Sequence, residues 1–495
     1  MKDSDSVSND RTTRISRRKF VVVGGVAVGV VVGGTLYYLS PALRNLVNSL
    51  LNIGGQGTTT TTAIIGPTTI EDLQWNPTRT VNSKVYDGKV SFAVDNSDPS
   101  NDQITLDFGS IYPVGMPQTA FTSEADRTYA FTSSGKRQTF SQDIANLVGG
   151  RQYRALVTVK DKNGKETVNY ADTPYVREFE NIAKDAGINI GAYYYPWYPK
   201  STLSYQGTPL LGYYNSQDQF VISKHIDWSS GYGIGYWLSS WFGPLDYRNQ
   251  VLFSNNLIDD VRIGITYESV DRLRDDITPE GYDSFNMNDK SNVDVLVNDF
   301  RSLAQNYFGL PQYWKIDNKP VVFLYLSRAY IGDISHALGL ARSAVQEYGF
   351  DPFIIGDEVF WDSPSQTPSS RLRSFDAITA YNLHSQPHYG VTDSNYESRI
   401  DSLFRAWSSK ANAAGTRFIP LATPGFRIIN SPERTLTRDV SRFEKRLKIA
   451  KKFVDSKIKV MMITTFNEWF ENTFVEPSTN EKFDYLQATR GAISS

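Results

Sequence analysis

The stretch KVMMITTFNEWFENTFVEP, residues 459–477, decides the fold and raises the question of function. Its first half is an apolar run of the kind that forms a strand buried on both faces. The run then breaks into a polar and aromatic segment with three acids, Glu468, Glu471 and Glu476. Ionised carboxylates are costly to bury, so their presence among large aromatic side chains indicates a specific role.

Seven other apolar runs precede this one. The eight runs are INIGAYYYPWY (188–198), YGIGYWLSSW (232–241), VRIGITYES (261–269), PVVFLYL (320–326), PFIIGDEV (352–359), DAITAYN (376–382), RFIPLATPG (417–425) and KVMMITTFNEW (459–469). Several gaps between them have helical periodicity, which indicates alternating β and α units around a parallel sheet. Eight such units in about three hundred residues predict a (β/α)8 TIM barrel. We assign residues 177–495 to this barrel domain, which we expect to be catalytic for the reasons given below.

Two gaps carry the clearest helical pattern. In residues 291–308 the apolar side chains share one face, and Ser291 is predicted to be the N-cap. Residues 440–454 repeat the same periodicity. The connection between the fifth and sixth runs, WDSPSQTPSSRLRS (361–374), has no clear helical pattern and is the least supported part of the barrel prediction.

The N-terminal segment indicates export or anchoring. Residues 1–20 end in the basic SRRKF, and residues 21–39 form an uncharged apolar run about long enough to cross a bilayer as a helix. The positive charges should then remain in the cytoplasm. SRRKF also resembles a twin-arginine export signal. No small-x-small cleavage site follows Leu39, so we expect a transmembrane anchor rather than a removed signal peptide.

A buried core helix is the alternative for this run, but its glycines and valines make a poor soluble helix. Residues 40–66 are a Gly/Thr-rich linker. We therefore expect a membrane-anchored protein whose folded parts lie outside the cytoplasm.

Between the linker and the barrel, residues 67–176 contain short alternating runs separated by turn residues, which predicts a small antiparallel β-sandwich. The stretch LVGGRQYRALVTVKDKNG, residues 147–164, resembles the end of a fibronectin type III or related immunoglobulin-like domain. Leu147 and Tyr153 are placed like the tyrosine corner of that family.

Composition excludes several classes of function. The 51 Lys and Arg residues nearly balance the 53 Asp and Glu residues, and no basic block lies outside the N-terminus, so a nucleic-acid partner has little electrostatic support. The chain has no cysteine, which excludes disulfides, zinc–thiolate sites and a thiol nucleophile. A neutral, aromatic-rich surface suits sugars better than phosphates, and no phosphate-binding glycine-rich loop is present. We expect no cofactor.

Two other polar pairs have competing interpretations. His384 and His388 have metal-ligand spacing, but Pro387 interrupts a helix there and no third ligand is apparent, so we predict no metal site. Asp357 and Glu358 are either a second acid pair or members of a structural network.

Polar residues collect where the predicted strands end, which is where the active sites of such barrels lie. Aromatic side chains at these ends can stack on pyranose rings. Glycoside hydrolysis needs a pair of acids, one to protonate the leaving oxygen and one to act as nucleophile or base. Glu468 and Glu471 are three residues apart and can face one cavity. The same spacing also occurs on solvated helices, but the position at the end of the last strand favours a site.

The motifs YYYPWY of the first strand and TTFNEWFENTFVEP of the eighth resemble those of glycoside hydrolase family 99, the endo-α-mannosidase family. SSWFGP, GITYES, VVFLYLSRAY, FDAITAYN and TPGFR fall in order where that family has comparable stretches. The resemblance implies that Glu471 is the general acid/base and that Glu468 removes a proton from the sugar 2-hydroxyl. A 1,2-anhydro sugar would form, and configuration would be retained.

Seven residues are predicted to bind the glycan substrate. The resemblance implies Tyr195, Trp241, Glu268, Tyr325, Tyr381 and Asn467, and we add Glu476 as the third acid of the segment. Some of them have structural alternatives, since residues 193–195 alternate along a strand and at least one should pack in the core. Trp241 and Trp469 could pack between domains.

The family usually has His and Gly where this chain has Phe470 and Asn472, which affects substrate choice more than reaction type. Two other functions stay open at this point. One is a non-catalytic cell-surface glycan-binding protein, and the other is a glucan-directed hydrolase of the same barrel type.

Overall fold

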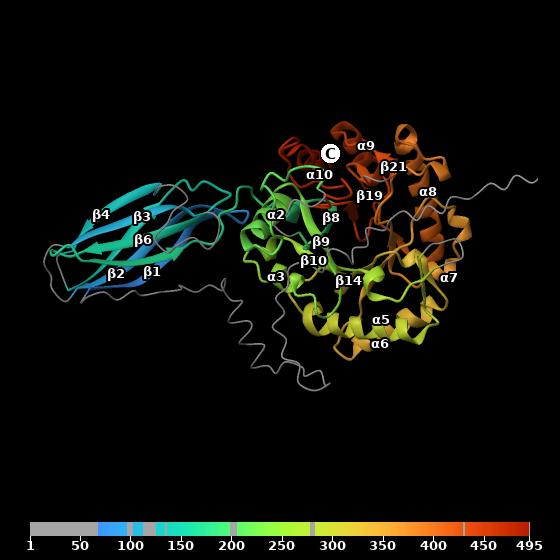
Figure 1. Cartoon of the computed structure of the whole chain (residues 1–495), viewed down its shortest axis with the longest axis horizontal. Helices are drawn as coiled ribbons and strands as arrows, with labels where there is room; N and C mark the ends of the chain where they lie inside the picture. Colours follow the sequence, from blue (N-terminus) through green and yellow to red (C-terminus); the bar gives the residue numbers. More distant parts are fainter. Residues whose placement is uncertain are drawn as a thin grey trace, which may run out of the picture.

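The computed structural model describes residues 68–96, 102–111, 125–133, 136–198, 205–277, 283–428 and 431–494. The expected anchor and linker lie outside these residues. Within them, no helix is both long and apolar enough to cross a membrane. The described chain forms a β-rich unit followed by a larger barrel, which lie side by side (Figure 1).

The β-rich unit is a sandwich of two antiparallel sheets. Its strands are β1 (Thr68–Val81), β2 (Lys84–Asn96), β3 (Gln103–Ile111), β4 (Arg127–Thr132), β5 (Arg137–Ile144), β6 (Gln152–Lys160) and β7 (Glu166–Asp172). One sheet has the order β1-β2-β5 and the other β4-β3-β6-β7. Phe92 and Phe108 belong to the core between the sheets. The Tyr153 hydroxyl donates to the Val148 carbonyl at 2.8 Å, which is the hydrogen bond of a tyrosine corner.

The larger unit is a TIM-like barrel built on a parallel sheet. Its strands are β8 (Asn189–Tyr194), β9 (Ile234–Trp241), β10 (Arg262–Tyr267), β14 (Lys319–Leu324), β16 (Phe353–Asp357), β17 (Ala377–Thr379), β18 (Arg417–Phe418), β19 (Leu421–Ala422) and β22 (Val460–Ile463). Each predicted apolar run contains one of these strands, except that the seventh run contains both β18 and β19. Buried parallel strands are continuous apolar runs, which is why the sequence indicates them clearly.

The sheet closes on itself through the seventh run. The strand order is β18-β17-β16-β14-β10-β9-β8-β22-β19, so the first and last strands are halves of one short segment. Between them, the Ile419 N–H donates to Ile378 at 2.9 Å, and the Pro420 carbonyl accepts from Met462 at 2.9 Å. Residues 417–422 are therefore hydrogen-bonded to both neighbouring strands.

The α-helices of the barrel lie in the connections between its strands and after the last strand. They are α2 (Gln219–Gly231), α3 (Arg248–Phe253), α4 (Ser269–Arg272), α5 (Lys290–Leu303), α6 (Ile334–Gln346), α7 (Ser369–Leu372), α8 (Tyr396–Ala414), α9 (Val440–Lys451) and α10 (Asp484–Ser494). The connection between β16 and β17 holds only the four-residue α7, in agreement with its lack of a helical pattern. The predicted N-cap of α5 is corrected, because the Asp289 side chain, not that of Ser291, caps the helix by accepting from the Ser291 N–H.

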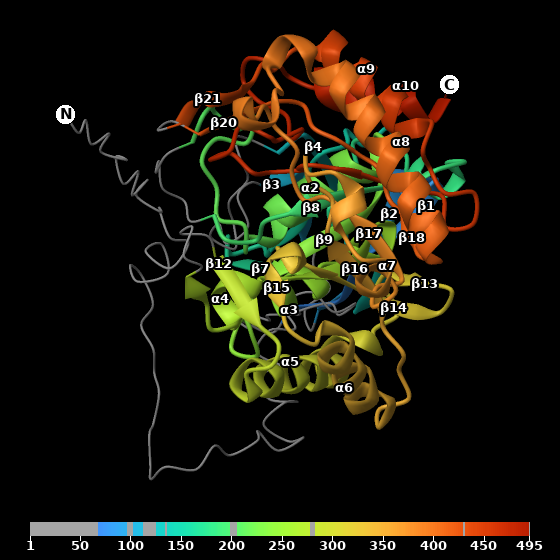
Figure 2. The ribbon, with the colours of Figure 1, turned by 90° about the vertical axis from the view of Figure 1, so that its right-hand side faces the viewer.

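Shorter strands lie at the two ends of the barrel. They are β11 (Asp276–Ile277), β12 (Asp283–Asn286), β13 (Lys315–Ile316), β15 (Tyr330–Ile331), β20 (Phe426–Ile428) and β21 (Ser431–Leu436). In Figure 2, β12, β15 and the β20–β21 pair, which follow the carboxyl ends of barrel strands, lie on one side of the barrel. β13, which precedes β14, lies on the opposite side. The side that carries β20 and β21 is the one where a barrel active site is expected.

Buried charges join the sandwich to the α2 side of the barrel. The fully buried Arg177 guanidinium lies 2.5 Å from the Asp260 carboxylate and 3.4 Å from that of Asp227 in α2. Ser83, in the turn between β1 and β2, donates to Asp260 at 2.8 Å. The two units are therefore fixed to each other by polar contacts from both sides of the junction.

Candidate active site

The segment after β22 forms a loop that is closed by its own backbone, and we call residues 465–476 the glutamate loop. The Thr465 N–H donates to the Thr473 carbonyl at 2.7 Å, and the Val475 N–H donates back to Thr465 at 3.0 Å. These bonds tie the start of the loop to its end. Both proposed catalytic acids lie inside this closed segment.

Glu468 is buried, with 2% of its surface exposed. Its Oε1 accepts from the Tyr198 hydroxyl at 3.1 Å and from the Phe470 N–H at 3.0 Å. Burial and the Glu468 charge raise the pKa of Tyr198 well above its ordinary value, so the phenol stays protonated and donates. Two neutral donors thus stabilise Glu468 in its ionised form, which is the form that a base requires.

The Glu471 side chain lies in a different environment, because it extends from the glutamate loop to the residues that follow β17. Its Oε2 accepts from the Tyr381 hydroxyl at 2.9 Å, and the Asn382 amide lies 3.4 Å from the same oxygen. The Tyr381 ring meets the Tyr325 ring edge to face, with centroids 5.2 Å apart. The structure therefore brings together three predicted site residues, Tyr325, Tyr381 and Glu471.

Asn467 and Tyr195 also meet, but through the backbone. The Asn467 side-chain oxygen accepts from the Tyr195 N–H at 2.7 Å, and its amide donates to the Tyr195 carbonyl at 2.9 Å. Asn467 is completely buried. Its side chain therefore fixes the end of β8 against the glutamate loop, a positioning role in place of the predicted substrate contact.

Glu268 follows β10 and is also buried. Its Oε1 accepts from the Ser240 hydroxyl of β9 at 2.6 Å. This contact places a third glutamate at the carboxyl ends of the strands.

Trp241, which is predicted to bind substrate, is buried on the face of β9 opposite to Ser240. Neighbouring side chains on a strand point to opposite faces, and Ser240 already points toward Glu268. Trp241 is buried beside Tyr267, whose hydroxyl donates to Asp299 of α5. The indole therefore faces the helical layer.

Glu476, which is also predicted to bind substrate, has its hydrogen-bond partners within the protein. Its carboxylate, at the end of the glutamate loop, is buried and accepts from Tyr214 at 2.7 Å and from the Trp469 indole at 2.8 Å. His225 of α2 lies 3.1 Å from the other oxygen. These partners engage both oxygens in the protein interior.

All three tyrosines at residues 193–195 are buried, and the first two pack on opposite faces of β8. The Tyr193 ring lies 5.0 Å from Phe323 and 5.1 Å from Tyr381, across the barrel interior. Tyr194 points the other way and stacks on Trp237 at 4.2 Å. This agrees with the expected alternation along the strand.

Asp357 and Glu358 form structural ion pairs. Asp357 accepts from Arg328 at 2.7 Å and from the Tyr381 N–H at 2.9 Å. Glu358 receives two hydrogen bonds from Arg371, at 2.6 and 3.0 Å. The structural-network interpretation of this acid pair therefore holds.

His384 stacks on Phe426 at 4.1 Å between ring centroids. Burial lowers its pKa to about 4. Among the residues that the structure describes, no group of three or more His, Asp or Glu side chains could hold a metal ion.

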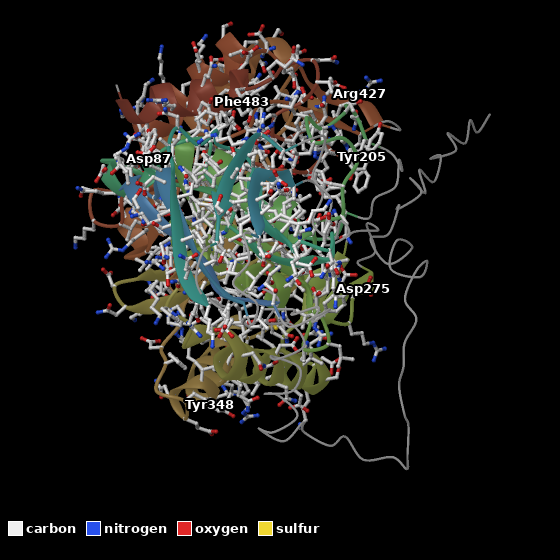
Figure 3. All side chains as sticks on the ribbon, turned by 90° about the vertical axis from the view of Figure 1, so that its left-hand side faces the viewer. Asp87, Tyr205, Asp275, Tyr348, Arg427 and Phe483 are labelled. Carbon is white, nitrogen blue, oxygen red and sulfur yellow. The ribbon has the colours of Figure 1, made fainter. Side chains whose placement is uncertain are left out.

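Tyr198, Asn382, Tyr214 and His225 contact the predicted acids but were not predicted as site residues. Tyr198 ends the YYYPWY motif, so its position at a strand end was a usable signal. His225 and Tyr214 lie about 250 residues before Glu476 in the chain, and no local pattern connects them to it. Figure 3 shows Tyr205, in the loop after β8, and Arg427, in β20, on one side of the molecule.

The comparisons with known proteins agree with this geometry. The family model described as glycosyl hydrolase family 99 matches residues 199–489, which is more than half of the chain. The chain belongs to glycosyl hydrolase family 99. It is therefore a glycoside hydrolase, and a β-rich region precedes the part of the chain that matches the family. A comparison with curated protein sequences found no match.

Two solved structures are similar to this family 99 chain at low sequence identity, and the first of them shares its fold. A "glycoside hydrolase-like protein" aligns with a TM-score of 0.51 and 20% identity, over 62% of this chain and 94% of its own. The endo-α-mannosidase of Bacteroides thetaiotaomicron aligns with a TM-score of 0.48 and 20% identity in its complex with bis-tris-propane, over 62% of this chain and 97% of its own.

The two departures from the family pattern have different physical consequences. Asn472 has a φ of 57°, in the left-handed region that favours glycine and that asparagine tolerates best among other residues. Asn therefore preserves the backbone of a position that is usually Gly. Phe470 packs against the rings of Tyr198 and Tyr205, at 5.3 and 5.7 Å, so an apolar ring replaces the usual imidazole.

Proposed function

We propose that this family 99 hydrolase cleaves α-mannosidic or related α-glycosidic bonds in glycans outside the cytoplasm, with retention of configuration. The observation that carries the proposal is that Glu468 and Glu471 lie on one closed loop but have separate hydrogen-bond partners. Tyr198 and the Phe470 N–H donate hydrogen bonds to Glu468, whereas Tyr381 donates one to Glu471. Separate surroundings allow one acid to be ionised while the other is protonated.

In the first step Glu471 acts as the general acid. Its Oε2 accepts from Tyr381, so the proton to be transferred is carried by the other oxygen. That proton passes to the glycosidic oxygen as the bond to the anomeric carbon breaks. The leaving alcohol departs neutral, and Glu471 becomes a carboxylate.

In the same step Glu468 acts as a base toward the sugar 2-hydroxyl. Its carboxylate takes the hydroxyl proton, and the freed oxygen attacks the anomeric carbon to close a 1,2-anhydro ring. Water then opens this ring while Glu471 removes the water proton and Glu468 returns its proton to the 2-oxygen. Two inversions at the anomeric carbon retain the configuration.

The location outside the cytoplasm is also part of the proposal. It rests on the basic SRRKF motif and the apolar residues 21–39 that follow it. Full-length protein should fractionate with membranes, whereas a chain that begins near Gly66 should be soluble and folded. Recovery of the intact full-length chain in the soluble fraction would contradict the anchor.

The test of the reaction is incubation of this soluble chain with defined α-mannosides and α-glucans, with the products followed by NMR. Initial release of the α-anomer from an α-mannoside is the expected result. Release of the β-anomer would overturn the retaining mechanism, and turnover of α-glucans alone would assign the enzyme to glucans. Binding without turnover of any glycan would favour the glycan-binding function.

A further inference from the structure

A buried polar network joins the glutamate loop to α2 and to the segment before α2, and the proposed reaction does not use it. At its centre is the Glu476 carboxylate, 2% exposed. Tyr214 and the Trp469 indole donate to Oε2 at 2.7 and 2.8 Å, and His225 lies 3.1 Å from Oε1. Residues 214 and 225, which lie far from Glu476 in the chain, therefore converge with Trp469 of the glutamate loop on one carboxylate.

The hydrogen-bond direction through His225 follows from the chemistry of its neighbours. An ionised carboxylate only accepts, so the proton of the imidazole lies on Nε2, toward Glu476. Nδ1 of the neutral ring then accepts from the Tyr194 hydroxyl at 3.1 Å. Burial and the Glu476 charge raise the pKa of Tyr194 and of Tyr214 well above their ordinary values, which keeps both phenols as donors.

The network reaches Glu468 through Trp469. Trp469 follows Glu468 in the chain, and its backbone N–H donates to the Tyr198 hydroxyl at 3.0 Å. The same hydroxyl donates to the Glu468 carboxylate at 3.1 Å. The indole is also stacked on Phe474, with centroids 3.7 Å apart. Trp469 is thus fixed by its ring, its indole N–H and its backbone.

We propose that His225 and Glu476 are positioning residues for Glu468. They hold Trp469, and Trp469 in turn holds Tyr198, which orients the Glu468 carboxylate toward the sugar 2-hydroxyl. This inference rests on the proposed function, because it assumes that Glu468 is the base. Neither His225 nor Glu476 touches the substrate in this arrangement.

The position of the network argues for a role beyond stability. Burying a carboxylate is costly, and the donors around Glu476 compensate this cost beside Trp469, the residue that follows Glu468 in the chain. Glu471, by contrast, is held from the opposite side by Tyr381. Loss of Glu476 should therefore displace Glu468 and leave Glu471 in place.

The experiment compares Glu476→Ala with Glu476→Gln in the full chain. Glu476→Ala removes the acceptor of Trp469 and Tyr214, and a displacement of about 1 Å can cost on the order of 10²-fold in rate. We expect a loss of that order in kcat, with KM little changed. Glu476→Gln keeps an oxygen for both donors and should restore most of the rate. His225→Gln, which can still donate to Glu476, should behave like Glu476→Gln if Glu476→Ala does not fold.

The leaving-group dependence separates this role from general damage to the loop. Glu468 is needed for any leaving group, so Glu476→Ala should slow an aryl α-mannoside with an acidic phenol and an unactivated α-mannoside equally. A larger loss for the unactivated substrate would show that Glu471 is displaced instead, and would overturn the inference.

Glu397 offers a matched control, since it is also buried and bonds to Arg442 and Arg446 between α8 and α9. Glu397→Ala should lower the melting temperature and leave kcat per folded molecule unchanged. If both alanine variants lose kcat in proportion to stability, the network is only structural. If Glu476→Ala retains full kcat while Glu468→Gln is inactive, the inference alone fails, whereas an active Glu468→Gln would overturn the proposed function itself.

Discussion

Two segments of the barrel each carry a close pair of acids. The two pairs differ in the hydrogen-bond donors that surround their carboxylates. After β16, Asp357 and Glu358 are bonded to the guanidinium groups of Arg328 and Arg371. In the glutamate loop, Glu468 and Glu471 accept from tyrosine hydroxyls, and Glu468 also from a backbone N–H.

The comparison teaches how a barrel separates structural acids from reactive ones. A guanidinium carries a positive charge at any accessible pH, so it balances the charge of the acid that it pairs with and occupies the oxygens of that acid. A phenol can donate to a carboxylate and does not neutralise it, which leaves the acid able to gain and lose a proton. Acids of the first kind should matter for folding, and acids of the second kind for turnover.

The largest effect is expected at the glutamate loop. General acid catalysis contributes about two to four orders of magnitude, so Glu471→Gln should reduce turnover of an unactivated glycan by at least that factor. An aryl glycoside with an acidic phenol needs less protonation and should lose far less. Glu468→Gln should abolish turnover of both substrates. Steady-state kinetics on the two substrates measure this difference.

The comparison holds only for variants that still bind ligand, so calorimetric binding of the glycan is the control. Equal losses for good and poor leaving groups in Glu471→Gln would argue against its role as the acid. Full activity in both variants would remove the distinction between the two acid pairs.

The next effect concerns the structural pair. Glu358→Ala leaves Arg371 without its carboxylate partner, and breaking a buried ion pair costs about 3 to 5 kcal/mol. The free energy of unfolding, measured by denaturant titration, should fall by about this amount, while kcat per folded molecule stays close to that of the original chain. A large fall in kcat with unchanged stability would place Glu358 among the reactive acids.

A third arginine-paired acid, Asp260 at the sandwich junction, extends the comparison to pH. Burial raises the pKa of Asp260, but Arg177 and the hydrogen bonds from Asn181 and Ser83 outweigh it, so the pKa lies below the ordinary 3.8. A lowered carboxyl pKa contributes stability above the unfolded value, and this contribution is lost as the pH falls through the folded value.

Asp260→Asn should therefore lower the free energy of unfolding near pH 7 by about 2 kcal/mol, and this difference should shrink below pH ~4. Asp227, the other partner of Arg177, is buried more deeply, and burial raises its pKa despite the arginine. A single substitution at Asp260 isolates the contribution of one acid. A difference between the two chains that stays constant down to pH ~3 would exclude a lowered pKa at Asp260.

The smallest effect is expected inside the glutamate loop, at Asn472. Because its φ is positive, Asn472→Gly should be nearly neutral, whereas Asn472→Ala should cost about 1 kcal/mol for the left-handed backbone. Thermal unfolding compares the two variants. Equal melting temperatures for the Gly and Ala variants would mean that this backbone conformation is not required.

Most of the barrel could be predicted from the sequence because its strands are long apolar runs that end in polar residues. The capping residue of α5 could not, because Asp289 and Ser291 are both favourable N-caps and propensity does not separate them. The short α7 agrees with the absence of a periodic pattern between β16 and β17.

The site was predictable only as far as strand ends reveal it. Glu468, Glu471 and Tyr381 follow apolar runs directly, and the structure places them at one end of the barrel. The surroundings of the Trp241 and Glu476 side chains could not be predicted from the spacing of residues in the sequence. The direction of Trp241 depends on which face of β9 is turned to the helical layer, and the burial of Glu476 depends on the packing of α2 against the loop.

Closure of the glutamate loop by its own backbone has a consequence for how such enzymes can diversify. The hydrogen bonds between Thr465, Thr473 and Val475 use main-chain atoms, which any side chain supplies. Both departures from the family pattern, Phe470 and Asn472, occur inside this closed segment. The side chains at these two positions can therefore change while the two glutamates keep their spacing. In such a loop, substitutions can change which sugar is accepted and leave the reaction the same.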